Sequence, residues 1–471
     1  MEQVTVQTAA RIQVMSATAD RVDLSAPRPP PSVVSLPRRR RKVAKPDFLA
    51  NLLLGCIADD FTGATDLANN LVRAGMRVVQ TIGVPTGPVA GVDAVVVALK
   101  SRTAPLVDAL AQSLAAARWL RAQGAPQIYF KVCSTFDSTP AGNIGPVTEA
   151  LMDELGAAFV VVTPAFPENG RTVFKGHLFV GDLLLSDSPM RDHPLTPMTD
   201  ANLVRVMQAQ LAPALGRRVG LIDHRTVALG APAIVQRMAA LHDEGVSIAI
   251  VDGVNDDDLR RLASASAALK LLVAGSGLAI GIPALHGLAP DPQAAQLPRA
   301  HGTRAIVSGS CSAATNAQVA AFITAGGAAF AVDPLRLAAG HDVAAEALAW
   351  ARPCLGATPV LVYATAEPAA VRAVQQQLGA QRAGALVEDT LARVAQGLVD
   401  AGVAQLVVAG GETSGACVQA LGITQLRIGP QIDPGVPWCH AALPGGGGLH
   451  LALKSGNFGG SDFFTRAFDL L

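Results

Sequence analysis

The sequence predicts an α/β protein of two domains, each a mainly parallel sheet flanked by helices. Its 471 residues exceed what one ordinary hydrophobic core holds. Half of the residues are hydrophobic, few are aromatic, and Gly is abundant. Short β-rich runs end in polar or Gly residues and are followed by amphipathic segments. This alternation is typical of parallel sheets covered on both faces.

The first 47 residues differ from the rest of the chain. They contain a Pro-rich stretch and a basic run from Arg38 to Lys42, and they show no lasting hydrophobic periodicity. We interpret residues 1–47 as a disordered basic tail. Attraction of the basic run to nucleic acid or to a membrane, and a wrongly assigned start codon, are the alternatives.

Residues 48–290 are predicted to form the first domain. A helical pattern at 105–124 ends at a glycine. The predicted strands of this domain cover 52–58, 94–99, 127–132, 159–163, 219–222, 247–251 and 269–274.

Residues 291–471 are predicted to form a second, smaller α/β domain. Its expected strands cover 304–309, 328–333, 358–365, 404–411 and 449–456. The segment 286–302 carries three prolines and little pattern, so we expect it to be the linker and a hinge.

Composition narrows the class of protein. The formal net charge is zero, and the part after the tail is mildly acidic, which argues against a nucleic-acid surface. The six cysteines are scattered without a zinc-type spacing, as in a reducing compartment. No apolar run is long enough to cross a membrane. We therefore expect a cytoplasmic protein without nucleic-acid or membrane partners, and a homo-oligomer stays open.

Polar residues follow the predicted strands of the first domain, where ligands of open α/β sheets bind. Acids, cations and hydroxyls would meet at one rim, which suits a small polyhydroxylated anion. These residues are Asp59, Asp60, Arg102, Lys131, Ser134, Thr135, Asp137, Asn143 and Arg171.

Each of these signals also has a purely structural interpretation. Asp60 or Thr62 could cap the helix that starts near Gly63. Lys131 could be a strand residue that reaches solvent. The stretch 134–139 could be only a cluster of local side-chain turns. The convergence of these residues on one rim is what favours a site.

The second domain carries glycine and small hydroxyls after three predicted strands. The stretches are VSGSCS (307–312), AGGETSGA (409–416) and KSGNFGG (454–460). Glycine lets a backbone approach a ligand closely, and free N–H groups can cradle phosphate oxygens. Glu412 could help to position Mg²⁺, although no metal ligands are assigned. Tight turns without a ligand are the alternative, and neither a Walker loop nor a dinucleotide fingerprint is present.

Together these motifs resemble the four-carbon acid-sugar kinases, and most closely the 3-oxo-tetronate kinase branch. IADDFTGATDLANNL, KVCSTFDST, GSGLAIG, VSGSCSAATNAQV, VAGGETSGA, IGPQIDPGVPW and LALKSGNFGG occur in the family's order over about 52–468. Asn457 in the last motif favours the oxo-tetronate branch over the threonate kinases. Residues 1–47 have no counterpart in the resemblance.

The resemblance implies a sugar-acid domain, a nucleotide domain, and ATP with Mg²⁺ between them. The expected reaction moves a phosphoryl group from ATP to the 4-hydroxyl of 3-dehydro-tetronate. Matched motif by motif, the ATP contacts fall on Ser308, Ser310, Gly411, Glu412, Thr413, Ser414, Gly456 and Asn457.

Among the first-domain residues, Arg102, Lys131 and Arg171 would include the clamp for the substrate carboxylate. Asp60 would act as base or metal ligand, and Asp59 would face substrate hydroxyls, because neighbours at a strand end point to opposite faces. A threonate or erythronate kinase, a sugar-acid aldolase or dehydratase, and a non-catalytic sensor of nucleotide and sugar acid are the alternatives.

Overall fold

The computed structural model of the protein describes residues 52–193, 196–356 and 358–471. The predicted tail, 1–47, lies outside the described residues. All of the described chain belongs to one compact unit that runs from Phe48 to Leu471.

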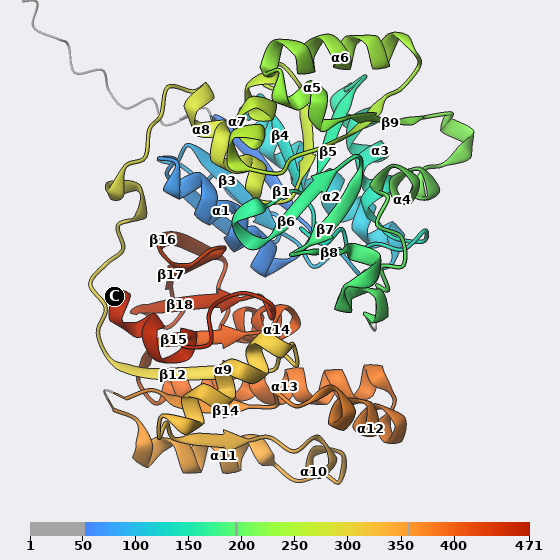
Figure 1. The fold of residues 1–471 in the computed structure, drawn as a ribbon. Coiled ribbons are helices and arrows are strands. Elements are labelled where there is room, and N and C mark those ends of the chain that lie inside the picture. Colours follow the sequence, from blue (N-terminus) through green and yellow to red (C-terminus); the bar gives the residue numbers. More distant parts are fainter. Residues whose placement is uncertain (1–51, 194–195, 357) are drawn as a thin grey trace, which may run out of the picture. The chain divides into compact units, whose positions relative to one another are not determined.

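The strands of the N-terminal half form a parallel sheet, which Figure 1 shows in blue to yellow-green. In spatial order they are β2 (Val78–Ile82), β3 (Ala94–Ala98), β1 (Leu54–Ala58), β4 (Ile128–Lys131), β11 (Leu271–Ala274), β5 (Val160–Thr163), β10 (Ile248–Val251) and β9 (Val219–Ile222).

Helices connect these strands and cover the sheet. They are α1 (Phe61–Arg73), α2 (Leu106–Ala122), α3 (Ile144–Leu155), α4 (Leu203–Gln210), α5 (His224–Ala228), α6 (Ala231–Asp243), α7 (Asp256–Ala265) and α8 (Ile282–Leu285). A separate antiparallel sheet consists of β6 (Arg171–Phe174), β7 (His177–Val180) and β8 (Leu183–Leu184).

The C-terminal half repeats the parallel arrangement and adds an antiparallel hairpin. Its strands in spatial order are β13 (Ala329–Ala331), β14 (Val360–Tyr363), β12 (Thr303–Ser308), β15 (Val403–Ala409), β18 (Gly448–Lys454), β17 (Val436–Ala442) and β16 (Gln425–Asp433). Its helices are α9 (Ala313–Thr324), α10 (Pro334–Ala338), α11 (Val343–Ala351), α12 (Pro368–Leu378), α13 (Ala380–Asp400), α14 (Gly411–Ala420) and α15 (Phe463–Arg466).

The mainly parallel α/β class is confirmed, and every strand expected from the sequence is present. The two sheets, however, are not separate. β16 pairs with β2 in antiparallel register, and this pairing joins the main sheets of the two halves into one 15-stranded sheet, from which only β6, β7 and β8 are separate among the described strands. The sequence reasoning did not identify β2, β16 or β17, because it searched for parallel strands followed by helices.

Both faces of the sheet are covered, and β1 shows how its sequence produces this. Cys56 and Ala58 belong to one buried cluster, whereas Ile57 between them belongs to another. All five residues of β1 are buried, as expected for a strand inside a doubly covered parallel sheet.

The register brings the ends of the central strands level. Ala58 of β1 lies opposite Ala98 of β3 and Lys131 of β4, and Lys131 lies opposite Ala274 of β11. The residues that follow these strands therefore share one edge of the sheet.

No helix among the described residues is long and apolar enough to span a bilayer.

Candidate active site

The turn from β1 into α1 positions the two adjacent aspartates. Asp60 is in an extended conformation and caps α1, since its Oδ1 accepts a hydrogen bond from the Gly63 N–H at 2.9 Å. Its Oδ2 accepts one from the Thr62 hydroxyl at 2.9 Å. The cap predicted from the sequence is thus confirmed. It does not exclude a role in a site, because Asp60 also meets an arginine.

Arg102 draws both carboxylates together. Its Nε and Nη2 donate to the two oxygens of Asp59 at 3.0 and 2.7 Å, and Nη2 also donates to Oδ1 of Asp60 at 2.8 Å. The expectation that neighbouring acids point to opposite faces is therefore wrong here. It assumed a continuing strand, whereas the backbone turns into α1 at Asp60 and lets both side chains reach one guanidinium.

The environments of the two acids nevertheless differ. The side chain of Asp59 is 5% exposed and that of Asp60 is 21% exposed. Burial raises the pKa of Asp59 against the opposing effect of Arg102. Burial also acts to raise the pKa of Asp60, but the charges of Arg102 and Lys131 outweigh it and hold that pKa below its ordinary value. Asp60 is therefore the more accessible member of the pair and the one whose pKa is lowered.

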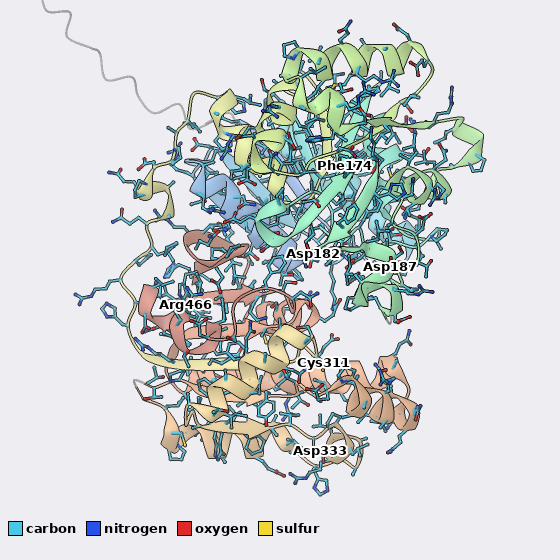
Figure 2. The ribbon with its side chains drawn as sticks, viewed as in Figure 1. Phe174, Asp182, Asp187, Cys311, Asp333 and Arg466 are labelled. Carbon is cyan, nitrogen blue, oxygen red and sulfur yellow. The ribbon has the colours of Figure 1, made fainter. Side chains whose placement is uncertain are left out.

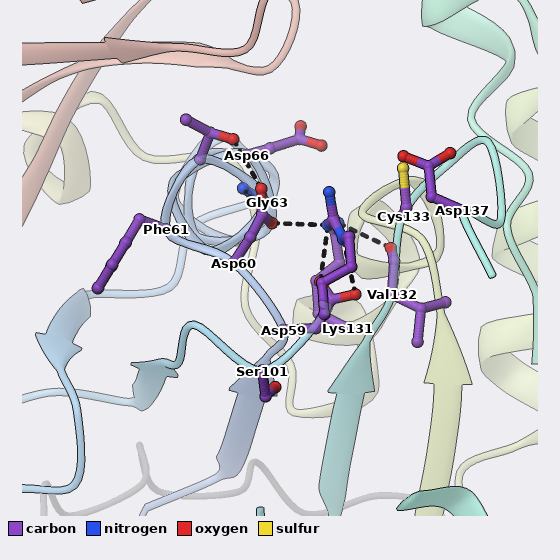
Figure 3. Close-up of polar contacts among 12 residues, drawn as sticks. Asp59, Asp60, Phe61, Gly63, Asp66, Ser101, Lys131, Val132, Cys133 and Asp137 are labelled. Atoms are coloured by element: carbon purple, nitrogen blue, oxygen red, sulfur yellow. Dashed lines mark hydrogen bonds and ion pairs between the residues drawn. The ribbon is translucent and has the colours of Figure 1, made fainter. Parts of the chain in front are cut away.

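Lys131 lies beneath the first turn of α1. It is 2% exposed, which excludes the solvent-reaching interpretation, and its Nζ donates to the Val132 carbonyl at 2.8 Å. A Cβ atom at Gly63 would lie 2.9 Å from this Nζ, so glycine is needed for the close approach. Figure 3 shows Lys131 in the same cluster as Asp59 and Asp60.

Asp66 is a buried acid of α1 that the sequence reasoning did not identify as a candidate. It is buried on α1, and its Oδ2 accepts a hydrogen bond from the Ser276 hydroxyl, while its Oδ1 has no partner among the described residues. Burial raises the pKa of Asp66 to about 6, against the opposing charge of Lys131. Its place within ADDFTGATD, close in sequence to the paired acids, was the available signal.

A small pocket adjoins the acidic pair. Its polar lining includes several residues predicted from the sequence, and its apolar lining comes mainly from β4 and α3. The lining residues are Asp59, Ser101, Arg102, Phe130, Asp137, Ser138, Asn143, Ile144 and Val147. The loop 133–138 also has local bonds: Thr135 lies 3.0 Å from the Cys133 sulfur and donates to Asp137. The loop 133–138 therefore forms local side-chain turns and also contributes Asp137 and Ser138 to the pocket.

Other predicted residues hold the rim in place. The side-chain amide of Asn143 donates to the carbonyls of Ser101, Arg102 and Ala104 at 2.8, 3.3 and 2.9 Å, so it fixes the loop that carries the guanidinium. Arg171 starts β6, and its guanidinium lies 5.9 Å from the centroid of the Phe458 ring. Ser134 is buried. Direct contact of these side chains with a substrate remains a prediction.

The second set of predicted residues shares the corresponding edge of the C-terminal half. Ser308 lies opposite Ala409, and Ala409 lies opposite Lys454, so the three Gly-rich loops leave β12, β15 and β18 side by side. Ser308 is buried, and its hydroxyl forms a hydrogen bond with the hydroxyl of Thr365 at 2.7 Å. Cys311, labelled in Figure 2, marks the loop between β12 and α9.

These loops contact one another closely. A Cβ atom at Gly456 would lie 2.4 Å from Oγ of Ser310, and one at Gly309 would lie 2.2 Å from Oγ1 of Thr413. The Gly456 carbonyl accepts hydrogen bonds from Ser312 and Thr315 at 2.5 and 2.9 Å. Ser414 is buried and Asn457 is exposed. A side chain at Gly309 or Gly456 would clash with these hydroxyls. The glycines therefore allow the loops to pack against each other, whether or not a ligand binds.

The two edges meet at the start of α14. A Cβ atom at Gly411 would lie 4.0 Å from Oδ2 of Asp60 and 3.9 Å from Oγ1 of Thr62. Glu412 pairs with Lys100 at 2.8 Å. The more accessible aspartate of the pair therefore lies at the N-terminus of a ten-residue helix, where backbone N–H groups favour an anion.

Two family models match successive stretches of the chain. Residues 54–282 match the family model of a sugar-binding N-terminal domain, and residues 305–464 match that of a nucleotide-binding C-terminal domain. The chain thus belongs to the class of α/β proteins that join these two family domains.

Curated relatives give the family. A 3-oxo-tetronate kinase of Pseudomonas fluorescens is 58% identical over 421 residues, which are 88% of this chain and 96% of the relative. A 3-oxo-tetronate kinase of Haemophilus influenzae is 46% identical over 417 residues, 88% of this chain and 99% of the relative. The chain belongs to the 3-oxo-tetronate kinase family, which confirms the resemblance of its motifs.

Solved structures agree with this membership. A DUF1537 family protein of Haemophilus influenzae has a TM-score of 0.69 and 44% identity, and covers 88% of this chain and 99% of its own. A protein of Salmonella typhimurium LT2 has a TM-score of 0.76 and 44% identity, and covers 88% of this chain and 98% of its own.

Proposed function

We propose that this protein is an ATP-dependent kinase that phosphorylates the 4-hydroxyl of a 3-dehydro-tetronate. The observation that carries the proposal is the position of Asp60. This ionised carboxylate belongs to the acid–arginine cluster of one edge and lies against the start of α14 in the Gly-rich edge. The names of the curated relatives support the choice of substrate.

The sugar acid would bind beside Asp59, at the edge of the sheet that carries the small pocket. Asp59, Asp137, Ser101 and Ser138 offer acceptors and hydroxyls for the hydroxyl groups of a four-carbon acid. Arg102 is committed to the acidic pair through Nε and Nη2, so it orients these acids as well as adding positive charge. Lys131 and Arg171 are the other cations that we propose for the substrate carboxylate.

The nucleotide would bind along the Gly-rich edge. Ser308, Ser310, Gly411, Glu412, Thr413, Ser414, Gly456 and Asn457 stay our proposed contacts. The N-terminus of α14 and the backbone of the loops after β12 and β18 suit a polyphosphate, because they present N–H groups without bulky side chains.

In the proposed reaction, oxygen O4 of the sugar acid attacks the γ-phosphorus and ADP leaves. Asp60 accepts the proton of the 4-hydroxyl on Oδ2, the oxygen nearer α14, while Oδ1 stays with Gly63 and Arg102. The low pKa of Asp60 keeps it ionised. A strong base is not required, since the transition state of phosphoryl transfer is loose and positioning dominates catalysis.

Mg²⁺ would enter with ATP. Among the described residues there is no cluster of three or more metal-ligating side chains, so a preformed all-protein cage is absent. This fits Mg²⁺, which commonly takes one or two carboxylates together with substrate phosphates and water. Glu412, through water, would supply a protein oxygen, and Asp60 would do so only in place of its role as the base. When bound, the ion would neutralise phosphate charge.

We also propose that 48–290 and 291–471 are the functional domains and that the active site lies in the cleft between them. Closure over both ligands would exclude water from the transfer. The use of ATP and six free cysteines support a cytoplasmic location.

A coupled assay of ADP release against a panel of four-carbon acids tests the proposal. We expect turnover with 3-dehydro-tetronates and much weaker turnover with threonate and erythronate, and phosphorus NMR of the product should show the ester at O4. Turnover of threonate alone would identify the other kinase branch. Binding of both ligands without ADP release would refute the kinase assignment.

A further inference from the structure

Lys454 is a buried lysine for which the proposed reaction has no role. It ends β18, is fully buried, and lies under the Gly-rich loops of the C-terminal half. Its Nζ is 3.0 Å from Oγ1 of Thr315 and 3.0, 3.1 and 3.1 Å from the carbonyl oxygens of Ser455, Gly456 and Phe458. One ammonium thus binds the loop after β18 and the start of α9.

This ammonium has no counter-ion in the part of the chain that the structure describes. Among the described residues, no carboxylate lies within 4.0 Å of Nζ, and neither α9 nor β15 contains an acidic or basic residue. The charged side chain that acts on it is Asp433 of β16, whose carboxylate is already bound by Arg466 and by the Gly460 N–H. A buried charge that is balanced only by carbonyl dipoles is costly.

We propose that Lys454 is the positioning residue of the nucleotide loop, and that its missing counter-charge is the polyphosphate of the nucleotide. The inference rests on the proposed nucleotide site. The ammonium holds the loop 455–459 in place by donating to its backbone carbonyls. Its positive charge then lies beneath the Gly-rich loops, against which the phosphates would bind. Lys454 does not touch the reacting atoms in this scheme.

The direction of its titration agrees with this role. Burial lowers the pKa of Lys454 to about 7, so the free protein holds its proton weakly near neutral pH. An anion bound above the loops favours the charged form. ATP binding should therefore take up a proton at pH 8, and ATP affinity should fall as the pH rises above about 7.

Isothermal titration of adenosine, ADP and ATP, without sugar acid, tests the proposal. Lys454→Met keeps the length of the side chain and removes the charge. We expect its ATP affinity to fall at least about tenfold while its adenosine affinity stays close to wild type, and its KM for ATP to rise without a change in the KM for the sugar acid. Lys454→Arg should recover part of the loss.

Lys270→Met is the matched control. Lys270 also donates to two backbone carbonyls, those of Leu155 and Gly156, but at another part of the sheet. Its variant should bind all three ligands like wild type.

An equal loss of adenosine and ATP affinity in Lys454→Met would mean a purely structural lysine and would overturn the inference, as would unchanged ATP affinity. If this variant does not fold, wild-type titrations at pH 8 in two buffers of different ionisation enthalpy decide, because absence of proton uptake overturns the inference. Failure of the wild-type protein to bind ATP at all would instead refute the proposed function.

Discussion

Gly63→Ala should destabilise the protein although alanine is the better helix former. A Cβ atom at this position would lie 2.2 Å from Oδ1 of Asp60 and 2.9 Å from Nζ of Lys131. The carboxylate cannot swing away freely, because it is short and three donors hold it.

The size of the effect follows from those contacts. Replacing glycine inside a helix gains about 1 kcal/mol. Displacing Oδ1 loses the cap bond from the Gly63 N–H, about 1 kcal/mol. It also loses the charge-assisted bond from Arg102, about 1.5–3 kcal/mol. The expected net destabilisation is therefore about 1.5–3 kcal/mol. The rate of phosphoryl transfer should fall at least about tenfold, because Asp60 no longer faces α14.

Urea unfolding followed by circular dichroism and single-turnover kinetics measure the two effects. Gly384→Ala is the control, because its Cβ in α13 would meet only a side-chain oxygen of Glu388 at 3.8 Å. It should gain about 0.5–1 kcal/mol and keep full activity. If Gly63→Ala is as stable and active as Gly384→Ala, the described arrangement of Asp60 is refuted.

Three further predictions concern the acids and the loop of this site. Asp60→Asn should lower the single-turnover rate about 10²- to 10⁴-fold, and Asp59→Asn should mainly raise the KM for the sugar acid. A dead Asp59→Asn beside a nearly wild-type Asp60→Asn would reverse our assignment of the two acids. The pKa of Asp66 is raised to about 6, so its contribution to stability is complete below its unfolded value near 4 and is lost as the pH rises through about 6. Asp66→Asn should remove that loss, which amounts to about 3 kcal/mol between pH 4 and pH 8, and parallel urea curves for both proteins at every pH would contradict this. Asn143→Asp should replace three donated bonds by repulsion from carbonyl oxygens and lower kcat/KM for the sugar acid about tenfold or more, with the KM for ATP as the internal control.

Much of the site was readable as a set of strand ends. Asp59, Arg102 and Lys131 each follow or end a run of β-forming residues, and parallel strands bring such ends to one edge. The Gly-rich loops were readable for the same reason. The spacing of residues in the sequence could not predict which side chains touch. Arg102 holds both aspartates, and Asn143 holds the loop that carries Arg102. Lys131 lies beneath Gly63.

Residues outside the strand-end pattern were missed. Asp66 sits on the second turn of α1, where a polar residue is ordinarily solvated, and only packing against Ser276 and the neighbouring elements makes it a buried acid. Lys454 looked like the polar end of a strand. Its burial depends on the loop 455–459 folding back over it.

The order of hydrophobic runs, turns and helical segments along the chain was enough to establish the α/β class, the two sets of strand ends and the kinase family. Those features depend on local periodicity and on motifs, which a linear sequence contains. Only the tertiary structure revealed three other features. They are the single joined sheet, the guanidinium shared by the two acids, and the buried lysine that has no counter-ion among the described residues. Each depends on residues that are far apart in the chain, such as β2 with β16 or Thr315 with Lys454, and on how much water the packing removes from them.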